Sequence, residues 1–354
     1  MVSKEFFKAL EQVAEERDIP KEKILDIFGK GLLNAYKKDY NGQQNAKVVF
    51  NEEKAEIIIV ATYLVVEEVD PEAEKGTQIT VMEAQQLKKN AKAGDIIEVK
   101  VTPKDFGRIA VSSAKQILTQ GLKQLERERN FEIFTDKTGE MVIAEIVAVN
   151  DEFVTLYLGF DTETSIPARD LVGTEIFVGN QIRVYITKVE QTTKGPKVYV
   201  SRTDRNLVKR LMEQSIPELQ EGVIEIMGLA RDPGDRCKVC VASNNLRVDP
   251  VGACLGRNGA RIHEVIDALD GEKIDVYKYS EDPAELVSNA IQPAKTTSVI
   301  VDQREKSAVI IVPDDQLSLA IGKKGQNARL AVQSSGWKID IKSETDAMIQ
   351  GIKY

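Results

Sequence analysis

Two short loops in the C-terminal part of the sequence combine glycines with positive charge. One is Gly256-Arg257-Asn258-Gly259, and the other is Gly322-Lys323-Lys324-Gly325. A glycine has no side chain to obstruct a ligand that approaches the backbone, and the first amide groups of a following helix favour an anion. A GxxG turn between two helices, with a cation between its glycines, is therefore suited to gripping a sugar-phosphate chain.

Polar and cationic side chains also follow each loop, where the second helix of the pair would begin. These further candidates for contact with RNA are Arg261, Asn327 and Arg329. A single GxxG is more often an ordinary tight turn than a binding site. Because the loop occurs twice, each time with a basic residue between its glycines, we interpret both as contacts for RNA or another single-stranded nucleic acid.

The two loops lie within a longer internal repeat. Residues 249–262 resemble residues 315–328 at an offset of 66, and residues 271–276 resemble residues 336–341 at an offset of 65. Around each copy the pattern predicts the order helix, strand, strand, helix, GxxG loop, helix, strand. The helix and two strands that precede each loop are expected at 204–214, 223–227 and 238–242, and then at 283–291, 298–302 and 307–312. A period of this size indicates a small α+β domain present twice.

Residues 138–202 are predicted to be nearly all strand and turn. Short β-rich runs cover 142–149, 153–158, 181–189 and 197–201. Five or so short strands in such a segment favour a small β-barrel of the OB-fold type.

Three aromatic residues are candidates on the surface of this barrel. Side-chain alternation places Phe153 and Tyr157 opposite the aliphatic residues of their strand, and Phe160 follows just beyond it. Exposed aromatics of this kind stack on bases. A packing seam against a neighbouring domain is the alternative, and the sequence leaves both open.

The first 132 residues have a different pattern. Helices are predicted at 4–17 and 21–40, separated by Pro20, and strands at 47–50, 56–66 and 96–101. A long polar helix over 106–130 is expected to lead into the barrel. We therefore predict a multidomain α/β and β chain with four domains, at 1–132, 133–202, 203–279 and 280–354.

Charge and composition limit the classes of function. The net charge is -8, and residues 131–200 carry 6 Lys and Arg against 11 Asp and Glu, so the chain is not built to coat nucleic acid by bulk electrostatics. Any such contact must come from local placement of cations. An odd count of 3 cysteines, with neither a signal peptide nor an apolar run of membrane-spanning length, predicts a soluble cytoplasmic protein.

Other chemical motifs are weaker. The pair Cys237 and Cys240 has zinc-site spacing but falls in a predicted strand, where positions three apart face opposite ways. The single histidine, His263, follows the first GxxG loop without a cysteine partner nearby. No phosphate-binding GxxxxGK loop occurs. We expect no catalytic residues, no metal, no cofactor and no enzymatic activity.

With its modules in this order, the chain resembles the NusA family of bacterial transcription elongation and termination factors. The resemblance is carried by segments along nearly the whole length: 106–110, 114–116, 200–203, 217–226, 230–234, 249–254 and 321–331. It implies an α+β N-terminal domain, a barrel of the ribosomal-protein-S1 kind and two tandem type II KH domains.

The resemblance also implies partners. Members of the family bind RNA polymerase through the N-terminal domain, hold nascent single-stranded RNA on the barrel and KH surface, and act with other Nus antitermination factors in pausing, termination and antitermination. It makes Lys30, Lys37 and Lys38 candidates for polymerase contact, although a solvated helix face explains these lysines equally well. We expect a monomer that does not bind membranes.

Two other classes of protein share these modules. Phosphorolytic ribonucleases also carry S1 and KH modules, but behind large catalytic domains for which 132 residues are too few. A ribosome-associated KH protein is the second alternative, and it would fractionate with ribosomes rather than with polymerase.

The second loop generates a direct test. Replacing both lysines, Lys323→Asp and Lys324→Asp, is expected to abolish most RNA affinity, because the charge that attracts phosphate is reversed. The melting temperature should stay nearly unchanged, because both residues lie in a loop. Unaltered RNA binding by the double variant, measured by fluorescence anisotropy, would remove this loop from the set of sites.

Overall fold

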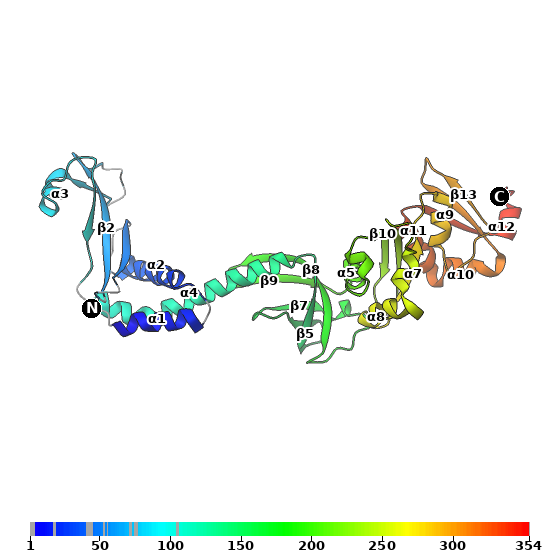
Figure 1. Cartoon of the computed structure of the whole chain (residues 1–354), viewed down its shortest axis with the longest axis horizontal. Coiled ribbons are helices and arrows are strands. Elements are labelled where there is room, and N and C mark those ends of the chain that lie inside the picture. The colour runs from blue at the N-terminus through cyan, green and yellow to red at the C-terminus, as the bar shows by residue number, and fades with distance from the viewer. Residues whose placement is uncertain are drawn as a thin grey trace. The chain divides into compact units, whose positions relative to one another are not determined.

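The structure is a computed structural model that describes residues 4–16, 19–39, 45–51, 54, 56–70, 73, 77–103 and 106–353 (Figure 1). The chain divides into two compact units, residues 1–129 and 130–354. The predicted helix ends at Arg17 and Tyr40 lie outside the described residues. Among the described helices, none combines the length and apolar character needed to cross a membrane.

The first unit consists of helices and one mixed sheet. Its elements are α1 (Lys4–Glu16), α2 (Lys21–Asp39), β1 (Ala46–Asn51), β2 (Glu56–Val66), β3 (Gln78–Thr80), α3 (Val81–Leu87), β4 (Ile96–Lys100) and the first part of α4 (Phe106–Asp136). Strand β2 pairs antiparallel with β1 and β4 and parallel with β3.

The core of this unit follows from helical periodicity. Ile24, Phe28, Leu32 and Tyr36 recur every four residues on α2, and all are buried. They pack with Phe7 and Leu10 of α1 and with Ile57 and Ile59 of β2. A Cβ at Gly31 would lie 2.3 Å from Cγ2 of Ile117, so a glycine is what lets α2 and α4 approach closely.

Two elements of the first unit were not predicted. Strand β3 is only three residues long, and α3 follows it at once. Thr80 and Glu83 form a capping box at the start of α3, in which each side chain accepts a hydrogen bond from the backbone of the other. This Thr-x-x-Glu pattern is visible in the sequence and is a known helix-start signal.

The second unit begins with the end of α4, which runs to Asp136 rather than to the predicted end near residue 130. A five-stranded sheet follows, in the order β7-β6-β5-β8-β9. Its elements are β5 (Met141–Val149), β6 (Phe153–Tyr157), β7 (Glu163–Pro167), the 3-10 turn η1 (Ala168–Asp170), β8 (Gln181–Thr192) and β9 (Gly195–Ser201). The hydroxyl of Thr164 on β7 donates to the carbonyl of Val198 on β9, which brings the edge strands together into a nearly closed barrel. This confirms the S1-type OB-fold, although β7 itself was not predicted.

Two α+β repeats complete the chain, as predicted. The first contains α5 (Arg205–Ser215), α6 (Pro217–Gln220), β10 (Ile224–Asp232), β11 (Arg236–Ser243), α7 (Pro250–Leu255), η2 (Arg257–Gly259), α8 (Ala260–Ala268) and β12 (Lys273–Lys278). The second contains α9 (Pro283–Ala290), β13 (Ser298–Asp302), β14 (Ser307–Val312), η3 (Asp314–Gln316), α10 (Leu317–Ile321), η4 (Lys323–Gly325), α11 (Gln326–Ser335), β15 (Lys338–Ser343) and α12 (Glu344–Ile349).

Both repeats have the same sheet. An antiparallel hairpin is followed by a third strand that pairs parallel with the middle one, in the orders β10-β11-β12 and β13-β14-β15. The four sheets formed by the described residues fall one in each predicted domain, and the domain boundaries themselves stay predictions.

A buried arginine joins the barrel to the first repeat. Arg202 donates to the carbonyls of Arg183 and Ala268, at 2.8 and 3.1 Å, and to the carboxylate of Asp270 at 2.5 Å. Thr174 of the barrel donates to the same carboxylate. Because this guanidinium is almost fully buried and has several partners, it fixes how the barrel meets the repeat.

The second repeat packs directly on the sheet of the first. A Cβ at Gly228 on β10 would lie 1.9 Å from the carbonyl oxygen of Ser334 on α11. The hydroxyl of Tyr277 donates to that of Ser334 at 2.9 Å. Lys238 of β11, fully buried, donates to the carbonyl of Gln292 at 2.6 Å, and burial lowers its pKa. The two repeats therefore share a core.

A buried ion pair lies within the first repeat. Nε of Arg231 lies 2.8 Å from Oε1 of Glu272, and the backbone amide of Gly234 donates to Oε2 at 2.9 Å. The Arg231 and Glu272 side chains are 4% and 0% exposed. Removing one partner of such a pair leaves an uncompensated buried charge.

The variant Glu272→Ala is expected to lower the free energy of unfolding of the repeat region by about 3–5 kcal/mol. Differential scanning calorimetry of the full chain would show this as an earlier transition. Glu281→Ala, which changes an exposed carboxylate in the same region, should leave the transition in place. Equal effects of the two variants would contradict this account of the pair.

Candidate nucleic-acid interface

The two GxxG loops have nearly the same backbone. In the first, φ is 72° at Gly256, 55° at Asn258 and 76° at Gly259. In the second, φ is 74° at Gly322, 54° at Lys324 and 75° at Gly325. Each loop joins two helices, α7 to α8 and α10 to α11. The sequence repeat is thus a repeat of backbone conformation.

The first glycine of each loop is required by close packing as well as by its positive φ. A Cβ at Gly256 would lie 2.8 Å from Cγ of Arg261, and one at Gly322 would lie 2.8 Å from the backbone nitrogen of Asn327. Packing does not require the last glycine of the second loop, because a Cβ at Gly325 would have open space around it. The first glycine is therefore the one that lets the closing helix fold back on the loop.

The residue two positions after each loop braces the two helices. Arg261 donates to the carbonyl of Ala253 at 2.8 Å and pairs with Glu218 of α6 at 2.8 Å. Asn327, which is 4% exposed, donates to the carbonyl of Ala320 at 2.9 Å and to that of Ile291 at 3.0 Å. We predicted both residues as RNA contacts, whereas in the structure both side chains bond to other groups of the protein.

The cations inside the loops point to solvent. Arg257, Lys323 and Lys324 are all exposed, and so is Asn258. Together with the amino ends of α8 and α11, they place exposed positive charge at both loops, which lie in the same compact unit of the chain. We call the loop at 256–259 the first clamp and the loop at 322–325 the second clamp.

Two further side chains lie at the clamps. Nδ1 of His263 is 2.7 Å from the carbonyl oxygen of Gly259, so the histidine supports the end of the first clamp. Arg329, at the equivalent position of the second repeat, forms an ion pair with Asp232 of β10. The sequence alone did not indicate a carboxylate beside this arginine.

The barrel aromatics are only partly free. Phe153 is 45% exposed and Phe160 is 50% exposed, while Tyr157 is half-buried. Phe160 contacts Phe134 of α4 edge-to-face at 6.2 Å, and Nζ of Lys137 lies 5.6 Å from its ring centre. Tyr157 pairs across the sheet with Glu145 and Glu163, two carboxylates that would repel phosphate. Phe160 thus packs partly against Phe134 of the barrel's own core, and the Phe153 side chain stays exposed.

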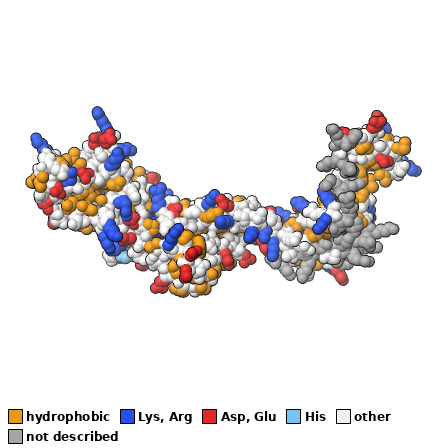
Figure 2. Space-filling model, turned by 180° about the vertical axis from the view of Figure 1, so that it is seen from behind, with side chains coloured by type: hydrophobic (Ala, Val, Ile, Leu, Met, Phe, Trp, Pro, Cys, Tyr) orange, Lys and Arg blue, Asp and Glu red, His pale blue; other side chains and the backbone are white. Residues whose placement is uncertain are grey.

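The surface charge is mixed. On the face of the molecule in Figure 2, blue Lys and Arg side chains alternate with red Asp and Glu side chains. Affinity for RNA would then depend on local sites such as the clamps rather than on a broad positive field.

The cysteines are buried and separated. Cys237 packs in the core of the first repeat, whereas Cys240 packs with residues of the second, so the two side chains lie on opposite faces of β11. Burial raises the pKa of Cys240 to about 11 and that of Cys254 to about 12. The predicted opposition of Cys237 and Cys240 is confirmed.

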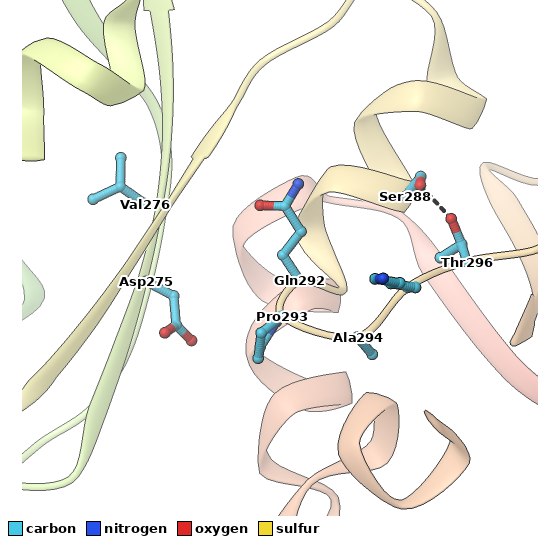
Figure 3. Close-up of a pocket in the computed structure, with 8 residues that line it drawn as sticks. Asp275, Val276, Ser288, Gln292, Pro293, Ala294 and Thr296 are labelled. Atoms are coloured by element: carbon cyan, nitrogen blue, oxygen red, sulfur yellow. Dashed lines mark hydrogen bonds between the residues drawn. The ribbon is translucent and has the colours of Figure 1, made fainter. Parts of the chain in front are cut away.

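A cavity of about 650 Å³ lies where the two repeats meet (Figure 3). Asp275 and Val276 of β12 form one wall, and the segment from Gln292 to Thr296 forms the other. The carboxylate of Asp275 is 3.0 Å from Arg236 and 3.4 Å from Lys238, so its charge is already balanced within the first repeat. The cavity therefore lies at the interface between the two repeats.

This fold and these clamps define a multidomain RNA-binding protein, with two tandem KH domains behind an S1-type barrel. Residues 5–128 match the NusA N-terminal domain, residues 202–279 the NusA-like first KH domain and residues 283–348 the NusA-like second KH domain. The chain belongs to the NusA family.

Three relatives illustrate the similarity. The transcription termination/antitermination protein NusA of Bacillus subtilis (strain 168) is 44% identical over 99% of this chain and 94% of its own length. That of Halalkalibacterium halodurans is 42% identical over 99% and 91%, and that of Thermus thermophilus is 37% identical over 96% and 89%. The similarity therefore covers every domain.

The glycine geometry predicts unequal effects of the same substitution. Gly322→Ala should disrupt the second clamp, because the new Cβ would collide with the backbone of Asn327 in addition to the cost of positive φ. Gly325→Ala adds only the conformational cost, about 1 kcal/mol. Amide hydrogen exchange should show faster opening of α11 in Gly322→Ala than in Gly325→Ala. Indistinguishable exchange in the two variants would argue against close packing as the reason for the first glycine.

Proposed function

We propose that this protein acts in transcription termination and antitermination by holding nascent single-stranded RNA on its KH clamps while residues 1–132 bind RNA polymerase. The observation that carries the proposal is the pair of clamps, which share one backbone conformation and expose Arg257, Lys323 and Lys324 from a single compact unit. The names of the relatives, quoted above, support the process.

Two clamps on one unit reconcile RNA binding with a net charge of -8. When the first clamp holds a strand, the second meets the same strand at a high effective concentration. Modest affinities at each clamp then combine, and the chain needs no broad basic surface. In this proposal Phe153 adds a stacking contact on the barrel, with Tyr157 and Phe160 as secondary contributors.

The contact with polymerase would involve α2 of the first unit. Lys37 and Lys38 lie in its last turn, where cations are favoured by the helix dipole. Lys30 lies seven residues before Lys37 on the same side of the helix and is exposed, with Asp26 at 2.6 Å. We propose these three lysines as the cationic part of that contact. Other Nus factors, a monomeric state and a cytoplasmic location belong to the same proposal.

The role we propose is binding rather than catalysis. A phosphorolytic ribonuclease would release nucleoside diphosphates from RNA in the presence of phosphate, and we expect no such release. A ribosome-associated protein would sediment with ribosomes, and we expect cofractionation with polymerase instead.

Single-round transcription on a template with a hairpin pause tests the proposal. Bacterial polymerase should pause longer when the full chain is present, and the effect should disappear when residues 1–132 are deleted. The matched control is the deleted chain itself, whose RNA affinity should be retained. Unchanged pausing with the full chain, alongside intact RNA binding, would refute the polymerase part of the proposal.

A further inference from the structure

The second clamp faces an acidic turn of the first KH domain. A cavity of about 430 Å³ is lined by Asp232, Pro233 and Asp235 from the β10–β11 turn and by four residues of the second KH domain, which are Lys323, Lys324, Gln326 and Arg329. Two carboxylates thus share a small space with the cations that would hold a phosphate.

The contacts fix these carboxylates in place. Nε2 of Gln326 donates to Oδ2 of Asp232 at 3.0 Å and to Oδ2 of Asp235 at 2.8 Å. Arg329 pairs with the same Oδ2 of Asp232. Every hydrogen bond that the described residues make to these two carboxylates thus goes to Oδ2. The Oδ1 atoms of both have no hydrogen-bond partner among the described residues.

Carboxylates beside a phosphate grip are unfavourable unless the ligand offsets them. They repel a phosphate, so they weaken the binding of any nucleic acid. Arg329 offsets the charge of Asp232 in part, whereas Asp235 accepts from the neutral amide of Gln326. An ionised carboxylate accepts hydrogen bonds and donates none, so a donor on the ligand would offset the remaining repulsion. The group next to a held phosphate is the sugar. Ribose carries a 2′-hydroxyl donor there, and deoxyribose does not.

We propose that Asp232 and Asp235 form a ribose-reading subsite with the second clamp. Oδ1 of one or both carboxylates accepts a hydrogen bond from the 2′-hydroxyl of the nucleotide whose phosphate lies at Lys323 and Lys324. The subsite favours RNA over DNA, because DNA meets the repulsion without the hydrogen bond. In dinucleotide sites, too, a carboxylate accepts a hydrogen bond from a ribose 2′-hydroxyl. This inference rests on the proposed RNA binding.

The test uses the full chain and two pools of single-stranded 12-mers of random sequence, one of RNA and one of uracil-containing DNA. Random pools make a choice of sequence unnecessary. The wild type should prefer the RNA pool. In at least one of Asp235→Ala and Asp232→Ala, the ratio of the two dissociation constants should fall by about ten- to a hundredfold, the worth of one hydrogen bond to a charged acceptor. Affinity for the DNA pool should rise, because a repulsive charge is gone.

Two further variants separate the possible causes. Glu305→Ala removes one exposed charge from the β13–β14 turn, the equivalent turn of the second KH domain, and should leave the ratio unchanged. Asp235→Asn keeps an acceptor oxygen without the charge, so it should lose less of the preference for RNA than Asp235→Ala does. Thermal unfolding of each variant checks that the fold is intact.

The outcomes are distinct. If Asp232 and Asp235 only brace Gln326 and Arg329, their loss weakens both pools equally and the ratio stays, which overturns the subsite. Equal loss of preference in Asp235→Asn and Asp235→Ala overturns the hydrogen bond. Failure of the wild type to bind either pool overturns the proposed function itself.

Discussion

The contact on which the C-terminal unit depends is the close approach of α11 to β10 at Gly228. Any side chain at this position would occupy the space of the Ser334 carbonyl, 1.9 Å from the expected Cβ. Since this approach is possible, Tyr277 can reach Ser334 and the buried Lys238 can reach Gln292. The two KH domains then share a core, and each clamp keeps a fixed position relative to the other.

That shared core also gives the second clamp surroundings that the first lacks. The β10–β11 turn is stabilised by Glu272, which accepts from Gly234 and pairs with Arg231. This turn places Asp232 beside Arg329 and Gln326. In the first clamp, His263 occupies the position equivalent to Arg329, and its Nδ1 lies 2.7 Å from the carbonyl oxygen of Gly259 in its own loop. Two loops with one backbone conformation can therefore differ in chemistry, because their neighbours differ.

Asn327 shows why a residue's type does not settle its role. A polar residue just after a phosphate-gripping loop is a reasonable RNA contact on sequence grounds. Here it is buried and joins α10 to α11 through the carbonyl of Ala320, and Arg261 joins α7 to α8 in the same way through Ala253. A buried polar group needs partners, which explains the contacts of Asn327, whereas the half-buried Arg261 is held by Ala253 and Glu218. Phe160 is a similar case, since the end of α4 extends far enough for Phe134 to meet it.

Local sequence patterns determined most of the helices and strands, the duplicated α+β domain and the two GxxG loops. Helical and strand periodicity, turn residues and glycine spacing all act over a few neighbouring residues. Strands β2, β13 and β14 fall on the residues expected for them. Strands β3 and β7 were not predicted, because β3 has only three residues and the sequence of β7, Glu-Thr-Ser-Ile-Pro, contains a single aliphatic residue, so neither shows an alternating pattern. Only the tertiary structure decided which charges meet. Asp232 and Arg329 are 97 positions apart, and what brings them together is the packing of one domain on another.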